Sequence, residues 1–268
     1  MLQSVRINKY LSEAGICSRR EADRQIERGN VTINGRPATM GDKVCPGDSV
    51  MYGKKRVSRE EEMILLAVNK PRGIVCTAEK REKDNIVDYI NYPKRIYPIG
   101  RLDKNSHGLI LMTNQGELGN KIMRSRNFHE KEYIVKVDRD VTESFLRGMS
   151  QGVYLRDLDA VTRPCQVEKV GKRTFRIILT QGMNRQIRRM CEHFQYRVLD
   201  LKRVRIMNIM LGDLKEGAFR EITPKEWEDL QHLLQDSSDK SSKERKEYGQ
   251  KSGRNKSRGT SETTGISQ

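Results

Sequence analysis

Residues 100–109 read Gly-Arg-Leu-Asp-Lys-Asn-Ser-His-Gly-Leu and form the most informative stretch of the chain. The flanking segments, residues 96–99 and 109–112, are rich in apolar residues, which indicates a loop between two strands of a sheet. Loops that a rigid sheet holds in place often carry catalytic groups. An Asp in a loop is nevertheless far more often a plain turn former. The stretch therefore makes Asp103 a candidate, and the rest of the chain has to support it.

This stretch lies within a long region, residues 63–234, that mixes strand-like and helix-like patterns. Apolar residues favour strands at 64–68, 133–137 and 174–179, and apolar residues at helical spacing favour helices at 142–149, 185–193 and 224–234. Strands and helices do not alternate strictly along the region. The pattern therefore favours an α+β domain over a doubly wound sheet.

The preceding region, residues 1–60, indicates two short helices followed by a hairpin. Ser18 and Glu21 form a capping-box pattern, in which each side chain bonds the other residue's backbone N–H at the start of the second helix. Gly29 is placed to end that helix. A short alternating segment then leads into Asn34-Gly35, a strong signal for a tight hairpin turn.

This helix-helix-hairpin pattern resembles the S4 RNA-binding domain. The resemblance rests on Arg6, Leu11, Ala14-Gly15, Ser18-Arg19, Ala22, Ile26, Gly29 and residues 31–35. Basic side chains crowd onto the two helices, and we expect them to bind RNA phosphates: Arg6, Lys9, Arg19, Arg20 and Arg24. The alternative is a solvated basic face with no specific role.

The charge of the chain points to a polyanionic partner. Its 268 residues carry a formal net charge of +16, with 35% hydrophobic residues and a mean hydropathy of -0.77. Such an excess of Lys and Arg is typical of proteins that neutralise phosphates, whose binding weakens steeply with salt. An anionic membrane is the competing partner, but no long basic amphipathic helix is evident, so RNA or DNA is favoured. No apolar run approaches the length of a membrane span.

The cysteines and the N-terminal segment suggest a cytoplasmic protein. Five cysteines are scattered without a CxxC pair, which argues against a disulfide framework or a zinc site and for a reducing compartment. No secretory signal is evident at the N-terminus.

Residues 235–268 are almost free of apolar side chains, so we expect a disordered tail that either solubilises the protein or attracts RNA weakly.

The region after residue 63 resembles the pseudouridine synthases of the RsuA/RluB/RluE/RluF family. The stretch around Asp103 is most similar to the RluF-like branch of that family. Four motifs occur in the family's order: Asn69-Lys70-Pro71-Arg72-Gly73, Gly100-Arg101-Leu102-Asp103 with Gly108-Leu109, Lys131-Glu132-Tyr133 with Val135, and Gly182-Met183-Asn184-Arg185-Gln186-Ile187-Arg188-Arg189-Met190. The resemblance implies a catalytic domain with a mixed, mainly antiparallel sheet and flanking helices.

The resemblance also implies that Asp103 is the catalytic carboxylate in the conversion of uridine to pseudouridine. Asp103 would attack as a nucleophile or remove a sugar proton as a base, and the sequence leaves both routes open. A carboxylate in a dry pocket needs a charged partner, and we expect it to be Arg188, whose planar guanidinium suits a carboxylate. Binding of RNA phosphate is the alternative role for Arg188, and Arg185 and Arg189 fit that role better.

Further residues of the four motifs receive roles from the same resemblance. Tyr133 would stack on the uracil once the base is extruded from the RNA, with a plain core aromatic as the alternative. Arg101 would fill the vacated stack or contact the backbone, and Leu201 would wall the uracil pocket unless it is simply core. We treat the first motif as mainly structural, with Lys70 near the loop of Asp103, and include Lys70 and Lys104 among the RNA-contacting residues.

The expected substrate is a uridine in 23S ribosomal RNA of a bacterium. The alternatives are the same activity on transfer RNA or 16S ribosomal RNA, and a noncatalytic RNA-binding or ribosome-assembly factor of the S4 type. An isomerisation without net redox change needs no cofactor or metal, and we expect none. His107, close to the loop of Asp103, is expected at the surface or in contact with RNA. We also expect a monomer without an obligate protein partner.

Overall fold

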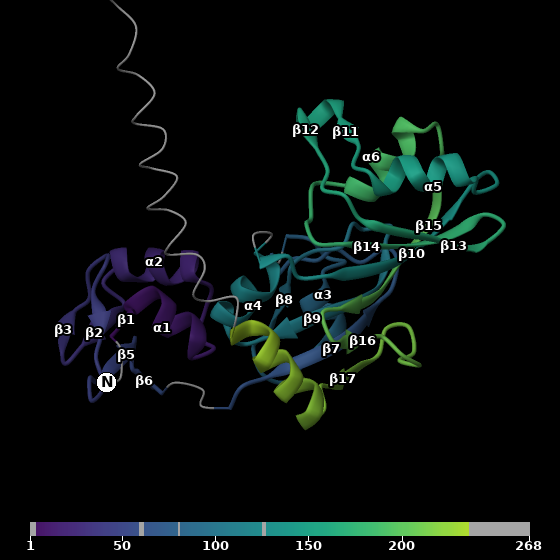
Figure 1. Ribbon diagram of the computed structural model, residues 1–268. Helices are drawn as coiled ribbons and strands as arrows, with labels where there is room; N and C mark the ends of the chain where they lie inside the picture. The colour runs from purple at the N-terminus through teal and green to yellow at the C-terminus, as the bar shows by residue number, and fades with distance from the viewer. Residues whose placement is uncertain (1–3, 59–61, 80, 125–126, 236–268) are drawn as a thin grey trace, which may run out of the picture.

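The N-terminal part of the chain forms two helices and a small sheet around a core of its own. The structure, a computed structural model, describes residues 4–58, 62–79, 81–124 and 127–235 (Figure 1). Helices α1 (Ile7–Glu13) and α2 (Arg19–Glu27) pack beside a sheet in the order β3 (Arg36–Pro37), β2 (Val31–Ile33), β5 (Val50–Tyr52) and β6 (Lys55–Val57), and β1 (Val5–Arg6) pairs with β4 (Lys43–Val44). This arrangement confirms the predicted helix-helix-hairpin module.

The local signals of this module act largely as the sequence predicts. The Ser18 hydroxyl caps α2 by accepting a hydrogen bond from the Glu21 N–H at 3.2 Å. The second half of the predicted capping box is wrong, because the Glu21 carboxylate accepts hydrogen bonds from Gln25 at 2.8 Å and from Arg24 instead. Asn34 and Gly35 both have positive φ, at 52° and 83°, which is the geometry of a two-residue turn between paired strands.

The second domain is built on one large mixed sheet. The main strand order is β13 (Gln166–Gly171), β14 (Thr174–Leu179), β10 (Lys131–Val137), β15 (Val198–Ile206), β9 (His107–Thr113), β7 (Leu65–Lys70) and β17 (Phe219–Glu221), while β16 (Ile209–Met210) pairs with β15 and β8 (Tyr97–Ile99) pairs with β9. Within this sheet β9 and β15 run parallel, and the other named pairs are antiparallel. The predicted α+β fold with a mainly antiparallel sheet is confirmed.

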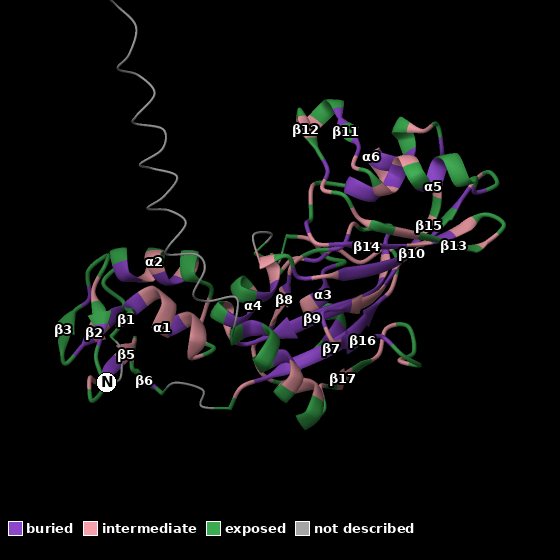
Figure 2. Ribbon diagram, in the orientation of Figure 1, coloured by how far each residue is buried: buried purple, intermediate pink, exposed green. Residues whose placement is uncertain are grey.

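Helices cover both faces of this sheet. One face packs against α3 (Ile86–Ile90), α5 (Glu143–Ser150) and α6 (Gln186–His193), and the other packs against α4 (Gly116–Met123) and a helix over residues 224–235. The central strands between these helices are buried (Figure 2). A small excursion, β11 (Tyr154–Leu155), the 3-10 turn η2 (Arg156–Leu158) and β12 (Ala160–Val161), lies near α6.

The predicted elements of this domain are present with shifted ends, and β14 coincides with its predicted range. The predicted helix at 185–193 begins one residue later, because Arg185 has a left-handed φ of 50° and precedes the first helical residue. Apart from its first residue, the tail that the sequence predicts to be disordered lies outside the described residues.

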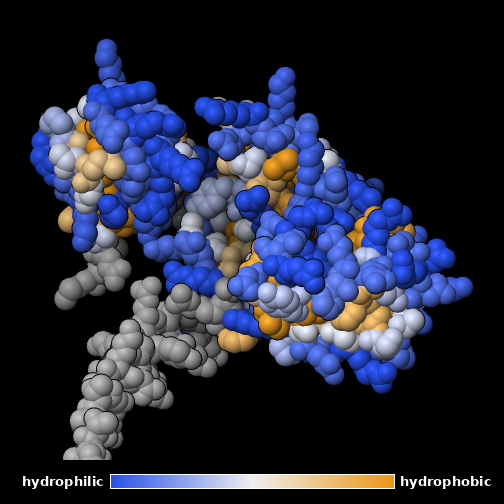
Figure 3. Space-filling view, turned by 90° about the horizontal axis from the view of Figure 1, so that it is seen from above, coloured by the Kyte–Doolittle hydropathy of each residue, from blue (hydrophilic) through white to orange (hydrophobic). Residues whose placement is uncertain are grey.

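The two domains contact each other through α1. Lys9 forms an ion pair with Glu117 of α4, and the Arg95 guanidinium donates to the Ser12 carbonyl at 3.1 Å. Arg95 also lies over the Tyr97 ring, 5.6 Å from its centroid. The surface above both domains is dominated by hydrophilic side chains with small hydrophobic areas between them (Figure 3). Among the described helices, none combines the length and the apolar character that a membrane span requires.

Candidate active site

Two glycines give the loop of Asp103 its shape. Gly100 has a φ of +73°, and an added Cβ would collide with the Met123 side chain. Gly108 has a φ of +100° and lies where β9 meets β15, so an added Cβ would collide with the backbone carbonyl of Arg203. Any other residue at Gly108 would therefore be strained and would push the parallel strands apart.

Lys70, in the first motif, lies buried beside this loop and bonds to its backbone. The Lys70 ammonium donates to the carbonyls of Pro71 at 2.7 Å, Ile74 at 2.8 Å and Lys104 at 3.3 Å. Lys70 is 0% exposed, and burial lowers its pKa. A buried ammonium group with these partners cannot reach an RNA phosphate, so the prediction that Lys70 contacts RNA is wrong. The structure does place Lys70 beside the loop of Asp103, as expected.

The Asp103 carboxylate lies between two guanidinium groups. Its Oδ2 atom is 3.8 Å from Nε of Arg188 and 4.0 Å from Nη1 of Arg185. The structure thus brings Arg188 next to Asp103, but not in the two-pronged contact that its planar group suggests. Arg185, which fitted a phosphate-binding role better on sequence grounds, also lies at the carboxylate. Its left-handed backbone turns its side chain toward the loop just before α6 begins.

Arg188 is held in place by neutral acceptors. Its Nη2 donates to the Ser106 hydroxyl at 3.3 Å and its Nη1 donates to the Val198 carbonyl at 3.4 Å. Its buried Nε has no hydrogen-bond acceptor among the described residues. Burial, followed by the charge of Arg185, lowers the pKa of Arg188, while Asp103 acts in the opposite direction. The group is therefore anchored on one side and keeps a donor directed at the carboxylate.

A cavity of about 450 Å³ opens beside Asp103. Its lining includes every residue that the sequence places at the catalytic site, namely Arg101, Asp103, Tyr133, Arg188 and Leu201, together with Arg185. Tyr133 comes from β10, and Leu201 comes from the neighbouring strand β15, while Arg188 comes from α6. The size of the cavity lies within the range of ligand-binding pockets.

Two basic residues of the cavity lining, Lys131 and Arg203, have no predicted role. Lys131 precedes Tyr133 by two positions in β10, and Arg203 follows Leu201 by two positions in β15, so each shares a face of the sheet with a predicted residue. The alternation of side chains along a strand was the signal that could have identified them. Both are almost completely buried, at 3% and 1% exposure.

His107, expected at the surface or in contact with RNA, is half-buried. Its Nε2 lies 2.8 Å from Oδ1 of Asp200, and that carboxylate also forms an ion pair with Arg72. Burial acts to raise the pKa of Asp200, but the contacts with His107 and Arg72 outweigh it and lower the pKa. Because Arg72 belongs to the first motif and His107 to β9, Asp200 connects the ends of three strands beside the loop.

The residues expected to bind phosphate differ in their exposure and in the protein groups that they already contact. Arg6, Arg19, Arg20 and Lys104 are exposed, although Lys104 lies 3.4 Å from Asp84. Arg24 is exposed and pairs with Glu21. Lys9 contacts Glu13 and Glu117, and Arg189 contacts Asp157 and Asn184. Phosphate binding by Lys9 or Arg189 would require these contacts to rearrange.

Within the described part of the chain, no cluster of three His, Cys, Asp or Glu side chains could hold a metal ion.

Comparisons with known proteins show which families the chain resembles. Residues 64–193 match the RNA pseudouridylate synthase family, and residues 5–50 match the S4 domain family. The chain is 56% identical to the dual-specificity RNA pseudouridine synthase RluF of Escherichia coli K12, over 88% of this chain and 81% of that protein. It is 37% identical to the ribosomal large subunit pseudouridine synthase B of Bacillus subtilis, over 85% of this chain and 96% of that protein.

A solved structure is also similar to this chain. A crystal structure of a pseudouridylate synthase superposes with a TM-score of 0.63 and 27% identity, covering 85% of this chain and 100% of that chain. The fold, the cavity and these similarities define an enzyme that acts on RNA. The chain belongs to the RNA pseudouridine synthase family, in which it is similar to RluF and related to the synthases of the B type.

Proposed function

We propose that the protein converts a uridine of 23S ribosomal RNA to pseudouridine, with Asp103 as the catalytic carboxylate. The observation that carries the proposal is the position of Asp103 at a cavity lined by Tyr133, with Arg188 and Arg185 within 4.0 Å of its carboxylate. A pyrimidine extruded from the RNA fits such a cavity, with the Tyr133 ring available for stacking.

The bond changes of the reaction can be balanced with Asp103 as the reacting protein group. The C1′–N1 bond breaks, and its electron pair remains on the uracil. At the sugar, Asp103 compensates by bonding to C1′ or by taking the proton from C2′. The uracil then turns, C5 bonds to C1′ with the same electron pair, and Asp103 leaves C1′ or returns the proton to C2′. Loss of the C5 proton and gain of a proton at N1 complete an isomerisation that requires no cofactor.

The RNA would be held from both domains. Exposed basic residues of α2 supply phosphate contacts that are independent of sequence, whereas the cavity selects the base. Arg101 is exposed at the cavity, which supports a contact with the RNA strand from which the uridine has been extruded. Because A-form duplex hides its base edges, we expect the target in a loop or an opened stem.

The decisive experiment incubates purified protein with unmodified transcripts of 23S ribosomal RNA, 16S ribosomal RNA and transfer RNA. Pseudouridine is then located by chemical mapping. We expect one modified position in the 23S transcript, no product with Asp103→Asn, and normal product with Asp229→Asn. Asp229 is a partly exposed carboxylate on the last helix and serves as the matched control. Pseudouridine formation by Asp103→Asn would overturn the catalytic assignment.

A second substrate belongs in the same assay, because the 56% identical relative is named a dual-specificity enzyme. Product on transfer RNA as well as on 23S ribosomal RNA would extend the proposal, and product on 16S ribosomal RNA alone would replace the substrate. A noncatalytic assembly factor is less well supported, since the residues around Asp103 are all in place. We further propose that the protein acts as a monomer in the cytoplasm.

A further inference from the structure

Two buried cations, Lys131 and Arg203, lie against the cavity and are called here the buried cation pair. Lys131 is 3% exposed and Arg203 is 1% exposed, and both line the cavity beside Asp103. The Arg203 guanidinium lies 6.0 Å from the centroid of the Tyr133 ring. Positive groups that are this deeply buried are normally matched by carboxylates, because removal from water is costly.

The buried cation pair lacks such carboxylates. The Lys131 ammonium donates to the His129 carbonyl at 3.0 Å, and Nε of Arg203 donates to the Leu109 carbonyl at 2.6 Å. Over the residues that the structure describes, neither cation forms an ion pair, and the buried Nη2 of Arg203 has no hydrogen-bond acceptor. Lys131 and Arg203 therefore bring positive charge to the cavity wall that no carboxylate of the described residues balances, and acceptors on a ligand could balance it.

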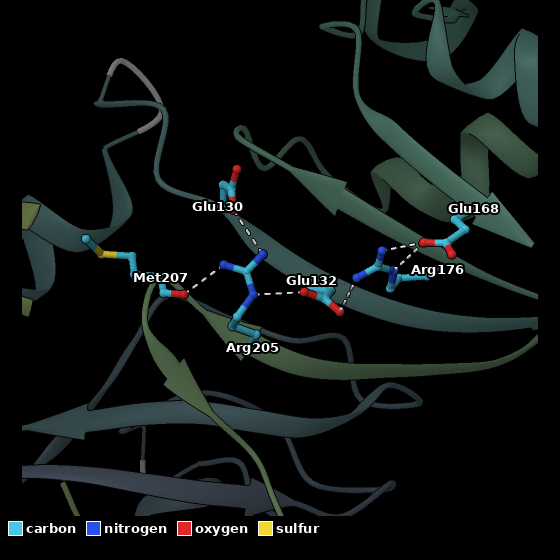
Figure 4. A network of polar contacts seen from close by, with 6 residues as sticks. All are labelled: Glu130, Glu132, Glu168, Arg176, Arg205 and Met207. Carbon is cyan, nitrogen blue, oxygen red and sulfur yellow. Dashed lines mark hydrogen bonds and ion pairs between the residues drawn. The ribbon is translucent and has the colours of Figure 1, made fainter. Parts of the chain in front are cut away.

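Arg205 in the same strand shows the usual arrangement (Figure 4). A β-bulge separates it from Arg203 and turns it to the face of Glu132, whereas Arg203 stays with Tyr133. Arg205 donates to Glu132 at 2.8 Å and to Glu130 at 2.9 Å. The strand therefore carries one arginine with full ionic partners outside the cavity and one without them inside it.

We propose that Lys131 and Arg203 bind the carbonyl oxygens of the extruded uracil and stabilise the negative charge that the base carries after the C1′–N1 bond breaks. This inference deepens the proposed function and rests on it. The electron pair left on the uracil spreads over N1, O2 and O4, so the oxygens gain charge at that moment. Donors already fixed in a water-poor cavity stabilise such a charge without rearranging.

The titration of Lys131 agrees with this arrangement. Burial and then the charge of Arg203 lower its pKa to about 8, so the ammonium lacks compensation until an anionic group arrives. A buried cation that serves catalysis is expected to lower the stability of the fold while it raises the activity. Replacing Lys131 by a neutral side chain of similar shape should therefore make the protein more stable and less active.

The test compares Lys131→Met and Arg203→Gln with wild type, with Lys136→Met as the control. Lys136 is exposed on the same strand and lies away from the cavity. Pseudouridine formation is followed in single turnovers at saturating target RNA, RNA affinity by filter binding, and folding by the melting temperature. We expect each cavity variant to slow turnover about 100-fold, with RNA affinity within about threefold, and Lys131→Met to melt at a higher temperature than wild type.

Each contrary outcome has a distinct meaning. Wild-type turnover in both cavity variants, or a lower melting temperature for Lys131→Met, would overturn this inference alone. So would weakened RNA affinity with normal turnover at saturation, since the cations would then bind a backbone phosphate. An inactive wild-type protein on all transcripts would overturn the proposed function and this inference with it.

Discussion

At the scale of single residues, a substitution of Arg188 can distinguish ion pairing with Asp103 from binding of an RNA phosphate. Its guanidinium reaches Asp103, Ser106 and Val198 from three different nitrogen atoms, whereas a lysine would offer a single nitrogen at one position. We expect Arg188→Lys to lower kcat about 100-fold at unchanged KM, because the lost contacts orient Asp103. The matched control is Arg189→Lys, and equal losses in the two variants would contradict the pairing role.

The lowered pKa of Lys131 predicts how the stability of the fold depends on pH. Its pKa falls from 10.5 to about 8 on folding, so between these pH values the unfolded chain binds more protons. The free energy of unfolding therefore gains from Lys131 as pH rises through this window, and below it the charged form costs about 3 kcal/mol. In urea titrations, Lys131→Met should be more stable than wild type at pH 7, with the difference shrinking toward pH 10. A constant difference would show that Lys131 does not titrate in this range.

The residues whose burial escaped prediction share one property: all are cations. The sequence motifs led to Asp103, and the structure places Arg188 beside it. Strand alternation could place Lys131 and Arg203 on the cavity face, but it could not predict their burial, because Lys and Arg are normally exposed and each could equally have been a phosphate contact. Lys70 lies under the loop, and Lys131 and Arg203 lie against the cavity, only because the sheet brings four strands together there. Their burial is a property of the assembled domain.

At the scale of elements, apolar patterns located some strands and missed others. β14 alternates buried and half-buried residues along its whole length, so its range could be predicted. β15 is the longest of the described strands, yet no strand was predicted there. The next buried position after Leu201 is Arg203, and charged residues interrupt the apolar alternation. The arginine that this strand brings to the cavity is thus the same residue that breaks the apolar pattern from which a strand is predicted.

The parallel contact between β9 and β15 depends on Gly108. A Cβ at this position would collide with the Arg203 carbonyl, and its φ of +100° is unfavourable for other residues. We expect Gly108→Ala to cost about 3 kcal/mol or more in the free energy of unfolding. Gly29→Ala is the control, since its φ of +73° is similar but the space around it is open, and strain alone costs about 1 kcal/mol. Equal losses would mean that β15 shifts easily.

At the scale of the whole molecule, the position of the S4 domain depends on a few contacts. Arg95 of the catalytic domain is half-buried and donates to both the Ser12 carbonyl, at 3.1 Å, and the Ser12 hydroxyl, at 3.3 Å. Apart from the Lys9 ion pair with Glu117, these are the main polar contacts described between the domains. Two RNA-binding surfaces held at a fixed separation bind one RNA more tightly than either does alone.

Loosening this contact should therefore weaken binding only for RNA long enough to reach both domains. We expect Arg95→Ala to reduce kcat/KM about 10-fold on a complete 23S transcript, because part of the advantage of two linked sites is lost. On a minimal stem-loop that occupies only the catalytic domain, the variant should match wild type. Arg147→Ala, which removes an exposed arginine of α5, controls for the loss of one charge. Equal losses on both RNAs would show that Arg95 acts on the catalytic domain itself, since the S4 domain cannot influence an RNA that it does not touch.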